Sequence, residues 1–396
     1  MTSLLRQAVG FERDLVAIRQ DLHRHPELAF REQRTARIAA DAVAALGFRV
    51  RRDVGRTGVV AEIGEGLPVV ALRADMDALP IQESSDVAYR STVDGVMHAC
   101  GHDAHVAMLI GAARLLAEAR AAGRLTGTVR LLFQPSEEAS DEEGKSGATR
   151  MIEDGAMEGV AAVFGTHIGA HLPAGRVYVS AGPIMAGSDL FTATVRGRSA
   201  HAGRPQEGVD AIVLAAHAIL ACQLGVARRV APDDAGVLSI GTIHGGFAEN
   251  VLAESVAVRG TIRYFRETAR QALRDALQRG FGVAETLGGR FDIDLHEGYP
   301  PVVNDLAMSR LAADAVGVAL GADAVVPFEP MMYAEDFALL AREAPGCFMW
   351  LGAALQPARE HHHPAFDIDE RTLPAGAAAL AACALAAPAA LQRHET

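Results

Sequence analysis

The sequence MHACGHDAH, at residues 97–105, places one thiol, three imidazoles and one carboxylate within nine residues. In it, Cys100 and His102 are spaced i, i+2, which suits two ligands that converge on one ion from a loop or an extended segment but do not share a helix face. A thiolate and a neutral imidazole favour zinc or another late divalent ion over magnesium or calcium. A buried cysteine beside polar loop histidines would look the same, so a metal site requires further ligands elsewhere in the chain.

Three more groups of acidic and imidazole side chains follow apolar runs that predict buried strands. They are QPSEE at residues 134–138, FGTH at 164–167 and EHHHP at 360–364. Open α/β sheets bind ligands at the carboxyl ends of their strands, so these groups are expected to meet at one edge. Of the adjacent Glu137 and Glu138, one can bind a metal ion while the other works as a base. The four groups together predict a metal site.

Helical and strand patterns alternate through most of the chain. Strands are predicted at residues 48–54, 58–63, 69–73, 128–133, 160–164 and 347–352, and helices at 15–25, 32–47, 106–123, 305–320 and 332–344. This order predicts an α/β fold with a mostly parallel sheet and helices on both faces. The Ala-rich segment 373–391, bracketed by Pro374 and Pro388, is predicted to be a terminal helix packed on the core and not a membrane span.

The pattern changes after Ser180. The predicted order is then a strand at 189–196, a helix at 209–224, strands at 237–244 and 255–265, a helix at 267–287 and a strand at 290–296. This βαββαβ order is that of a ferredoxin-like unit. We therefore predict that residues 184–298 form an inserted α+β lid, and that residues 1–183 and 299–396 form the catalytic domain.

Six stretches carry a resemblance to a known family. They are DLHRHPEL (21–28), LRADMDALPI (72–81), MHACGHDAH (97–105), QPSEE (134–138), AEDF (334–337) and HHPAFDIDE (362–370). In this order they resemble the bacterial amidohydrolase branch of the zinc-dependent aminoacylase and carboxypeptidase family, which includes hippurate hydrolases, N-acyl-amino-acid deacylases and auxin-conjugate hydrolases. The resemblance extends from about residue 10 to the C-terminal helix and covers nearly the whole chain.

The resemblance implies a centre of two divalent ions, zinc or manganese, with cobalt or nickel also compatible with the donors. The implied ligands are Cys100, which is a candidate bridge, His102, Glu138, His167 and His362, although His361 and His363 remain alternatives to His362. Glu137 is the implied general base. Asp75, Asp77 and Glu335 are candidates for orienting ligands, with a turn or helix-capping role as the alternative.

Three residues of the predicted lid carry further candidate roles by resemblance. His201, in SAHAGRP (199–205), would stabilise the oxyanion in a partner subunit's site, and Asn250 and Arg263 would hold the substrate. The lid would mediate a homodimer or homotetramer. The sequence departs from the family in having Ala334 where serine is usual and Ala253 where proline is common, and neither change removes an implied ligand.

Composition narrows the classes of function. The formal charge of -12 argues against a nucleic acid or an anionic membrane as partner, and 50% hydrophobic residues supply a sizeable core. Cysteines at 100, 222, 347 and 383 do not form a disulfide framework, and the N-terminus has no secretory pattern, so a cytoplasmic location is expected.

The sequence thus predicts a metal-dependent amidohydrolase that cleaves N-acyl amino acids, such as acetyl or benzoyl derivatives, to a carboxylic acid and a free amino acid. A dipeptidase or carboxypeptidase with the same dinuclear centre is the nearest alternative. Two further alternatives are an amidase with Cys100 as nucleophile and a metal-binding scaffold without catalysis.

Overall fold

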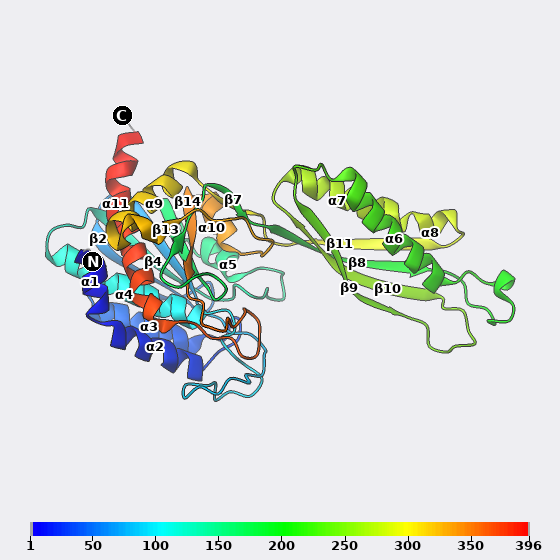
Figure 1. Ribbon diagram of the computed structural model, residues 1–396, viewed down its shortest axis with the longest axis horizontal. Helices are drawn as coiled ribbons and strands as arrows, with labels where there is room; N and C mark the ends of the chain where they lie inside the picture. Colours follow the sequence, from blue (N-terminus) through cyan, green and yellow to red (C-terminus); the bar gives the residue numbers. More distant parts are fainter. Residues whose placement is uncertain (1–2, 395–396) are drawn as a thin grey trace. The chain divides into compact units, whose positions relative to one another are not determined.

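The computed structural model describes residues 3–394. They divide into two compact units with separate hydrophobic cores (Figure 1). Unit 1 contains the described residues up to Gly182, residues 303–329 and the residues from Asp336 onward. Unit 2 contains residues 183–302 and 330–335. The chain passes between the units within β7 (Gly182–Met185) and β12 (Val302–Asn304), and again before and after residues 330–335.

Unit 1 is built on a sheet of eight strands in the order β1-β2-β4-β3-β5-β14-β6-β13. Their bounds are β1 (Arg49–Val54), β2 (Gly58–Glu65), β3 (Val69–Asp75), β4 (Gly127–Gln134), β5 (Val160–Gly169), β6 (Val177–Tyr178), β13 (Val325–Val326) and β14 (Gly346–Gly352). The central strands β4, β3, β5 and β14 are parallel to one another, whereas β1 and β2 are antiparallel additions at one edge. The predicted mostly parallel sheet is confirmed.

Helices cover both faces of this sheet. Those of unit 1 are α1 (Ser3–Val9), α2 (Glu12–Arg24), α3 (Gln33–Ala45), α4 (His102–Ala121), α5 (Gly147–Glu153), α9 (Leu306–Leu320), α10 (Phe337–Glu343) and α11 (Leu373–His394). Every residue of β3 and β14 is buried, which requires cover on both sides because successive side chains point to opposite faces. Met349 packs in the core with α4 and α11, whereas Phe348 contacts Phe337 of α10, with ring centroids 4.7 Å apart.

Helices α4 and α11 pack closely in the centre of unit 1. A Cβ at Gly376 would lie 2.0 Å from Met108 Sδ, so a larger residue here would have to displace the Met108 side chain. By length and composition α6 and α11 are each apolar enough to cross a membrane, but 72% of the α11 window is buried inside the protein, as in a core helix. The predicted packing of the Ala-rich tail on the core is confirmed.

Several predicted boundaries are wrong. The helix expected at 332–344 covers only Phe337–Glu343, and the Asp336 carboxylate at its N-cap position is bound by other segments. Helix α11 passes through Pro388, as the predicted range 373–391 requires, and ends at His394. Helix α4 starts at His102, four residues before the expected Val106. Strand β5 extends past His167, where pairing with β14 continues.

Unit 2 has the order β8 (Gly187–Arg196), α6 (Ala211–Arg229), β9 (Gly236–Gly245), β10 (Ser255–Tyr264), α7 (Glu267–Phe281), α8 (Val283–Thr286) and β11 (Arg290–Glu297). The antiparallel sheet has the strand order β11-β8-β10-β9, which is the ferredoxin-like order, and the helices lie along one side of it (Figure 1). The outer strand β9 is an edge.

Candidate metal centre

The carboxyl ends of parallel β3, β4, β5 and β14 meet at one edge of the unit 1 sheet. Asp75 at the end of β3 lies beside Gln134 at the end of β4, and His167 of β5 lies beside Trp350 of β14. The loops that follow these strands carry the acidic and imidazole groups of the sequence motifs. The topology therefore brings segments that are far apart in the chain to one place.

His102 is the first residue of α4 and is fully buried. It follows Gly101, whose φ of +94° and whose close approach to Ile168 favour glycine. Its Nδ1 lies 3.2 Å from Asp77 Oδ1, while its Nε2 has no hydrogen-bond partner among residues 3–394. A carboxylate that fixes one imidazole nitrogen while the other is left open is the usual arrangement of a metal-binding histidine.

Three overlapping groups of potential ligand atoms contain the predicted ligands and the predicted base. Within each group the atoms lie within 4.8 Å of one another, and the groups are Cys100, His102 and His167; Cys100, Glu138 and His362; and His102, Glu137 and Glu138. Cys100 Sγ lies 3.5 Å from His167 Nε2, and His362 Nε2 lies 3.0 Å from Glu138 Oε1. The five predicted ligands and the predicted base are thus brought together within unit 1. Their thiol, imidazole and carboxylate donors suit a zinc-like or manganese-like ion.

The three consecutive histidines after Glu360 have different surroundings. His361 is largely buried, accepts a hydrogen bond from the Ala170 backbone N–H at 3.1 Å, and has its pKa lowered to about 3 by burial. His363 Nδ1 accepts the Ala365 N–H. His362 alone among them belongs to a group of potential ligands.

Electrostatics around Cys100 argue against the thiol-nucleophile alternative. Burial, followed by the charges of Glu138 and Glu137, raises the pKa of the Cys100 thiol well above its ordinary value. A nucleophilic cysteine needs the opposite, a lowered pKa beside cationic groups. A bound cation would reverse this effect, because a coordinating thiol is deprotonated by its metal ion.

A layer of charged residues, which includes the predicted Asp75, lies behind the potential ligands. Arg73 Nη1 pairs with Asp75 at 2.7 Å, and its Nη2 pairs with Asp336 at 2.9 Å. The other oxygen of Asp75 binds His105 Nδ1, and Asp75 Oδ2 lies 3.6 Å from His102 Nε2. Arg73, set in the apolar strand β3, was the available sequence signal, since a buried arginine requires partners. Glu335, predicted to orient a ligand, is buried.

In unit 2 the two glycine-flanked loops that carry His201 and Asn250 pair with each other. The Ala202 N–H donates to Asn250 O at 3.0 Å, and His201 forms a bridge with Val251. His201 Nδ1 accepts the Gly203 N–H at 2.9 Å. In the neutral ring the proton therefore lies on Nε2, which makes the exposed side chain a hydrogen-bond donor.

Arg263 is not close to these loops within unit 2. The loop that carries Asn250 leads into the start of β10, whereas Arg263 lies near the other end of that strand, opposite Ser188 and Val237. The eight residue steps from Ser255 to Arg263 span roughly 26 Å at about 3.3 Å per residue. Arg263 Nη1 is buried without a hydrogen-bond partner among residues 3–394.

Residues 71–386 match the model of Peptidase family M20/M25/M40. The chain belongs to this family. It is 40% identical to N-acetyl-L-cysteine deacetylase of Bacillus subtilis, with 91% of this chain and 85% of the relative covered. It is 38% identical to thermostable carboxypeptidase 2 of Saccharolobus solfataricus, with 94% of each covered.

A solved structure from Bacillus subtilis, described as a dinuclear metal binding peptidase of the same family, superimposes with a TM-score of 0.83. It is 36% identical and covers 96% of this chain and 99% of its own. The predicted family, the α/β fold and the prediction of a hydrolase are confirmed. The potential ligand groups and this relative together support divalent metal ions as cofactor.

Proposed function

We propose that this hydrolase cleaves the amide bond of N-acyl amino acids, such as N-acetyl or N-benzoyl derivatives, and uses two divalent ions. The observation that carries the proposal is the convergence of Cys100, His102, Glu138, His167 and His362 in overlapping groups, in which the buried His102 Nε2 has no hydrogen-bond partner among residues 3–394. When bound, such ions polarise the scissile carbonyl and lower the pKa of water. Zinc and manganese fit the donors best, and cobalt and nickel are compatible with them.

Glu137 is the proposed general base. Its carboxylate lies within 4.8 Å of the ligand atoms of His102 and Glu138, and its side chain is buried. It would take a proton from the attacking water and pass it to the leaving amine, which departs as the free amino acid. Glu137→Gln should lower kcat by about 10²- to 10⁴-fold while the metal content stays unchanged. Unchanged turnover in fully metal-loaded Glu137→Gln would show that this assignment is wrong.

Unit 2 is proposed to act as a lid and as the contact between subunits. Helix α6 carries the exposed apolar residues Val213, Leu220 and Leu224, and β9 is an exposed sheet edge. Neighbouring copies could cover both in a homodimer or homotetramer. Light scattering should give an oligomer of the wild type, and Leu220→Glu should shift it toward the monomer.

His201 is proposed to donate its Nε2 proton to the oxyanion in the partner subunit's site, with Asn250 holding the substrate. Arg263, with its buried unpaired nitrogen, is the proposed partner of the substrate carboxylate. Complementation tests the action of His201 across subunits. His201→Ala and Glu137→Gln chains, each nearly inactive, should recover about a quarter of wild-type activity when co-expressed as a statistical mixture of dimers. No recovery in verified mixed dimers would place His201 in its own subunit's site.

The proposal is tested by metal analysis of the purified protein combined with a substrate panel. About two ions per chain, as in a two-metal site, together with loss of hydrolysis on chelation and its return on metal addition, would support it. The panel should include N-acetyl and N-benzoyl amino acids and unblocked dipeptides, because a carboxypeptidase-named relative favours a peptidase as second candidate. A cytoplasmic location is also proposed, since all four cysteines are free and buried thiols.

A further inference from the structure

Glu32 is a fully buried carboxylate outside the proposed ligand set. One oxygen accepts the backbone N–H groups of Phe30 and Ser136, each at 2.9 Å. The other accepts the hydroxyl of Thr57. The side chain therefore ties together three segments: the turn before α3, the turn between β1 and β2, and the loop that follows β4.

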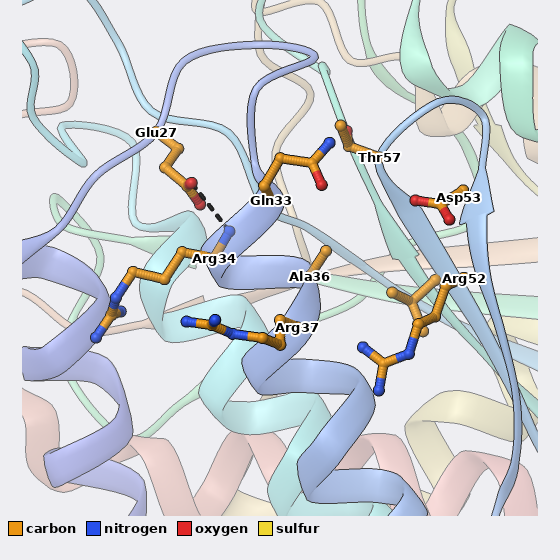
Figure 2. A pocket seen from close by; sticks show the side chains of 9 residues that line it. Glu27, Gln33, Arg34, Ala36, Arg37, Arg52, Asp53 and Thr57 are labelled. Carbon is orange, nitrogen blue, oxygen red and sulfur yellow. Dashed lines mark hydrogen bonds between the residues drawn. The ribbon is translucent and has the colours of Figure 1, made fainter.

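The position of Glu32 directly before α3 would normally mark a helix cap, but another residue performs that task. Glu27 Oε1 accepts the Arg34 N–H at 2.9 Å, and Glu27 Oε2 accepts the Thr35 N–H at 2.8 Å. Figure 2 shows Glu27 beside the start of α3, in a groove of about 440 Å³ that Thr57 also lines. Because Glu27 satisfies these N–H groups, Glu32 is not required as a cap, and its own side chain makes no cap bond.

The loop held by Glu32 carries the proposed base and a proposed ligand. Ser136, directly before Glu137, is buried and has a φ of +47°. A residue other than glycine costs about 1–2 kcal/mol in this left-handed region, so the conformation persists only where its surroundings impose it.

Four hydrogen bonds fix this loop. The Ser136 N–H donates to Glu32, Ser136 O accepts the Gly147 N–H at 2.9 Å, and Ser136 Oγ donates to Ala139 O at 2.8 Å. The Glu138 N–H donates to Asp77 Oδ2 at 2.9 Å. Asp77 also holds His102, so the loop and the imidazole share one support. Glu32 is the anchor at the other end of the loop.

We propose that Glu32 is a positioning residue that holds Ser136 in its left-handed conformation and thereby places the Glu137 and Glu138 carboxylates for catalysis and metal binding. This inference rests on the proposed function of those two residues. Without the anchor, Ser136 can relax to an ordinary φ, and the two carboxylates after it change direction. A displacement of about 1 Å at a catalytic group can cost about 10²-fold in rate.

The chemistry of the anchor predicts which substitution is tolerated. Glu32→Gln retains a carbonyl oxygen for the Phe30 and Ser136 N–H groups, and its amide can donate to Thr57 Oγ1. Glu32→Leu has a similar size but accepts no hydrogen bond. Thr57→Val is the matched control, because it removes one partner of Glu32 and leaves the bond to Ser136 intact.

The experiment compares these variants as metal-loaded full-length proteins. Glu32→Leu should lower kcat by about 10²-fold with KM changed by less than about threefold, and should weaken metal binding by about 10- to 100-fold through Glu138. Glu32→Gln and Thr57→Val should stay within about fivefold of wild type. A merely structural role would lower the melting temperature and leave kcat per folded molecule unchanged.

Folded Glu32→Leu protein with wild-type kcat and metal affinity would overturn the inference. If Glu32→Leu does not fold, Glu32→Met takes its place under the same criteria, because its thioether has a similar length and is only a weak acceptor for the Ser136 N–H. If the wild type shows no metal-dependent hydrolysis, the proposed function fails, whereas metal affinity in the same variants still tests the positioning of Glu138.

Discussion

Replacing Arg19 with methionine should strongly destabilise unit 1. The guanidinium of Arg19 in α2 is fully buried and lies 2.9 Å from Asp103, 3.2 Å from Asp367 and 3.2 Å from Glu370. Asp103 follows His102 in the first turn of α4, so this ion-pair group joins α2 to the segment that carries the proposed ligands Cys100 and His102. Methionine is similar in length and leaves the carboxylates without their cation.

The expected loss of unfolding free energy in Arg19→Met follows from the burial of its ion pairs. Removing one partner of a buried ion pair costs about 3–5 kcal/mol, because the other charge is left in a medium of low polarity. His23 Nδ1 lies 2.7 Å from Asp103 and still compensates it in the variant, so we expect a value near the lower limit, about 3 kcal/mol. The control is Arg114→Met, which breaks an exposed pair with Asp14 and should cost about 1 kcal/mol or less.

The difference in unfolding free energy between wild type and Arg19→Met should also depend on pH. Burial by itself would raise the pKa of Asp103, but Arg19 and His23 outweigh it and hold that pKa well below its ordinary value. A lowered carboxyl pKa contributes stability that is present above the unfolded-state value of about 3.8 and is lost as the pH falls below it. The gap between wild type and Arg19→Met should therefore be largest at neutral pH and narrow below about pH 4.

Urea unfolding of metal-free protein measures this difference. The single tryptophan, Trp350, is buried in β14 and reports on unit 1 by fluorescence, with circular dichroism as the second probe. A loss below about 1 kcal/mol, equal to that of Arg114→Met, would refute the argument that Arg19 compensates buried charges. So would a loss of the expected size that does not narrow in acid.

Three further substitutions test the support of the site. Gly101→Ala should lower the unfolding free energy by at least about 2 kcal/mol and weaken metal binding, because its Cβ would lie 2.3 Å from Ile168 Cγ2. Gly95→Ala has open space around it and should cost only the backbone strain. Equal losses of the two variants in urea unfolding would contradict this. Asp77→Asn should weaken metal binding about 10- to 100-fold in chelator competition, and unchanged affinity would show that Asp77 does not orient His102. Burial and then Asp77 raise the pKa of Glu32 from 4.5 to about 7. As the pH rises from about 4.5 through about 7, the unfolding free energy of metal-free wild type should therefore fall by up to about 3 kcal/mol relative to that of Glu32→Gln. Parallel profiles of unfolding free energy against pH for the two proteins would refute this.

The sequence predicted those parts of the protein that depend on local pattern. Strand runs followed by acidic or imidazole residues identified the edge of the sheet and the residues that meet there, because the parallel order fixes where such residues emerge. The strand order of unit 2 was equally predictable, since βαββαβ has a preferred order that this unit adopts. At the starts of α4 and α10 the apolar pattern has no sharp limit, and the predicted boundaries there were wrong.

The supporting residues were not predictable in the same way. Asp336 lies at the N-cap position of α10, but its carboxylate is bound by Arg73 and Gln134 from two other strands. Glu32 occupies a cap position in the sequence and binds Ser136, 104 residues away. Local sequence shows that such residues can accept hydrogen bonds, but the partner depends on which segments the sheet order brings together.

The distribution of satisfied and unsatisfied polar atoms distinguishes this centre from an ordinary buried polar cluster. Buried polar groups are normally hydrogen-bonded, and Asp75, Asp77 and Asp336 follow this rule with partners from several segments. His102 Nε2 departs from it among residues 3–394, as do both nitrogens of buried His98, but only the His102 ring of these two is fixed by Asp77 and lies near the Cys100 thiol. A protein core would gain stability from filling such a position with an apolar side chain. An imidazole nitrogen without a hydrogen bond, among neighbours that are hydrogen-bonded, is therefore better explained by a ligand that binds to it. A cation would bind this nitrogen and would also compensate the negative charges of Glu138 and of a Cys100 thiolate.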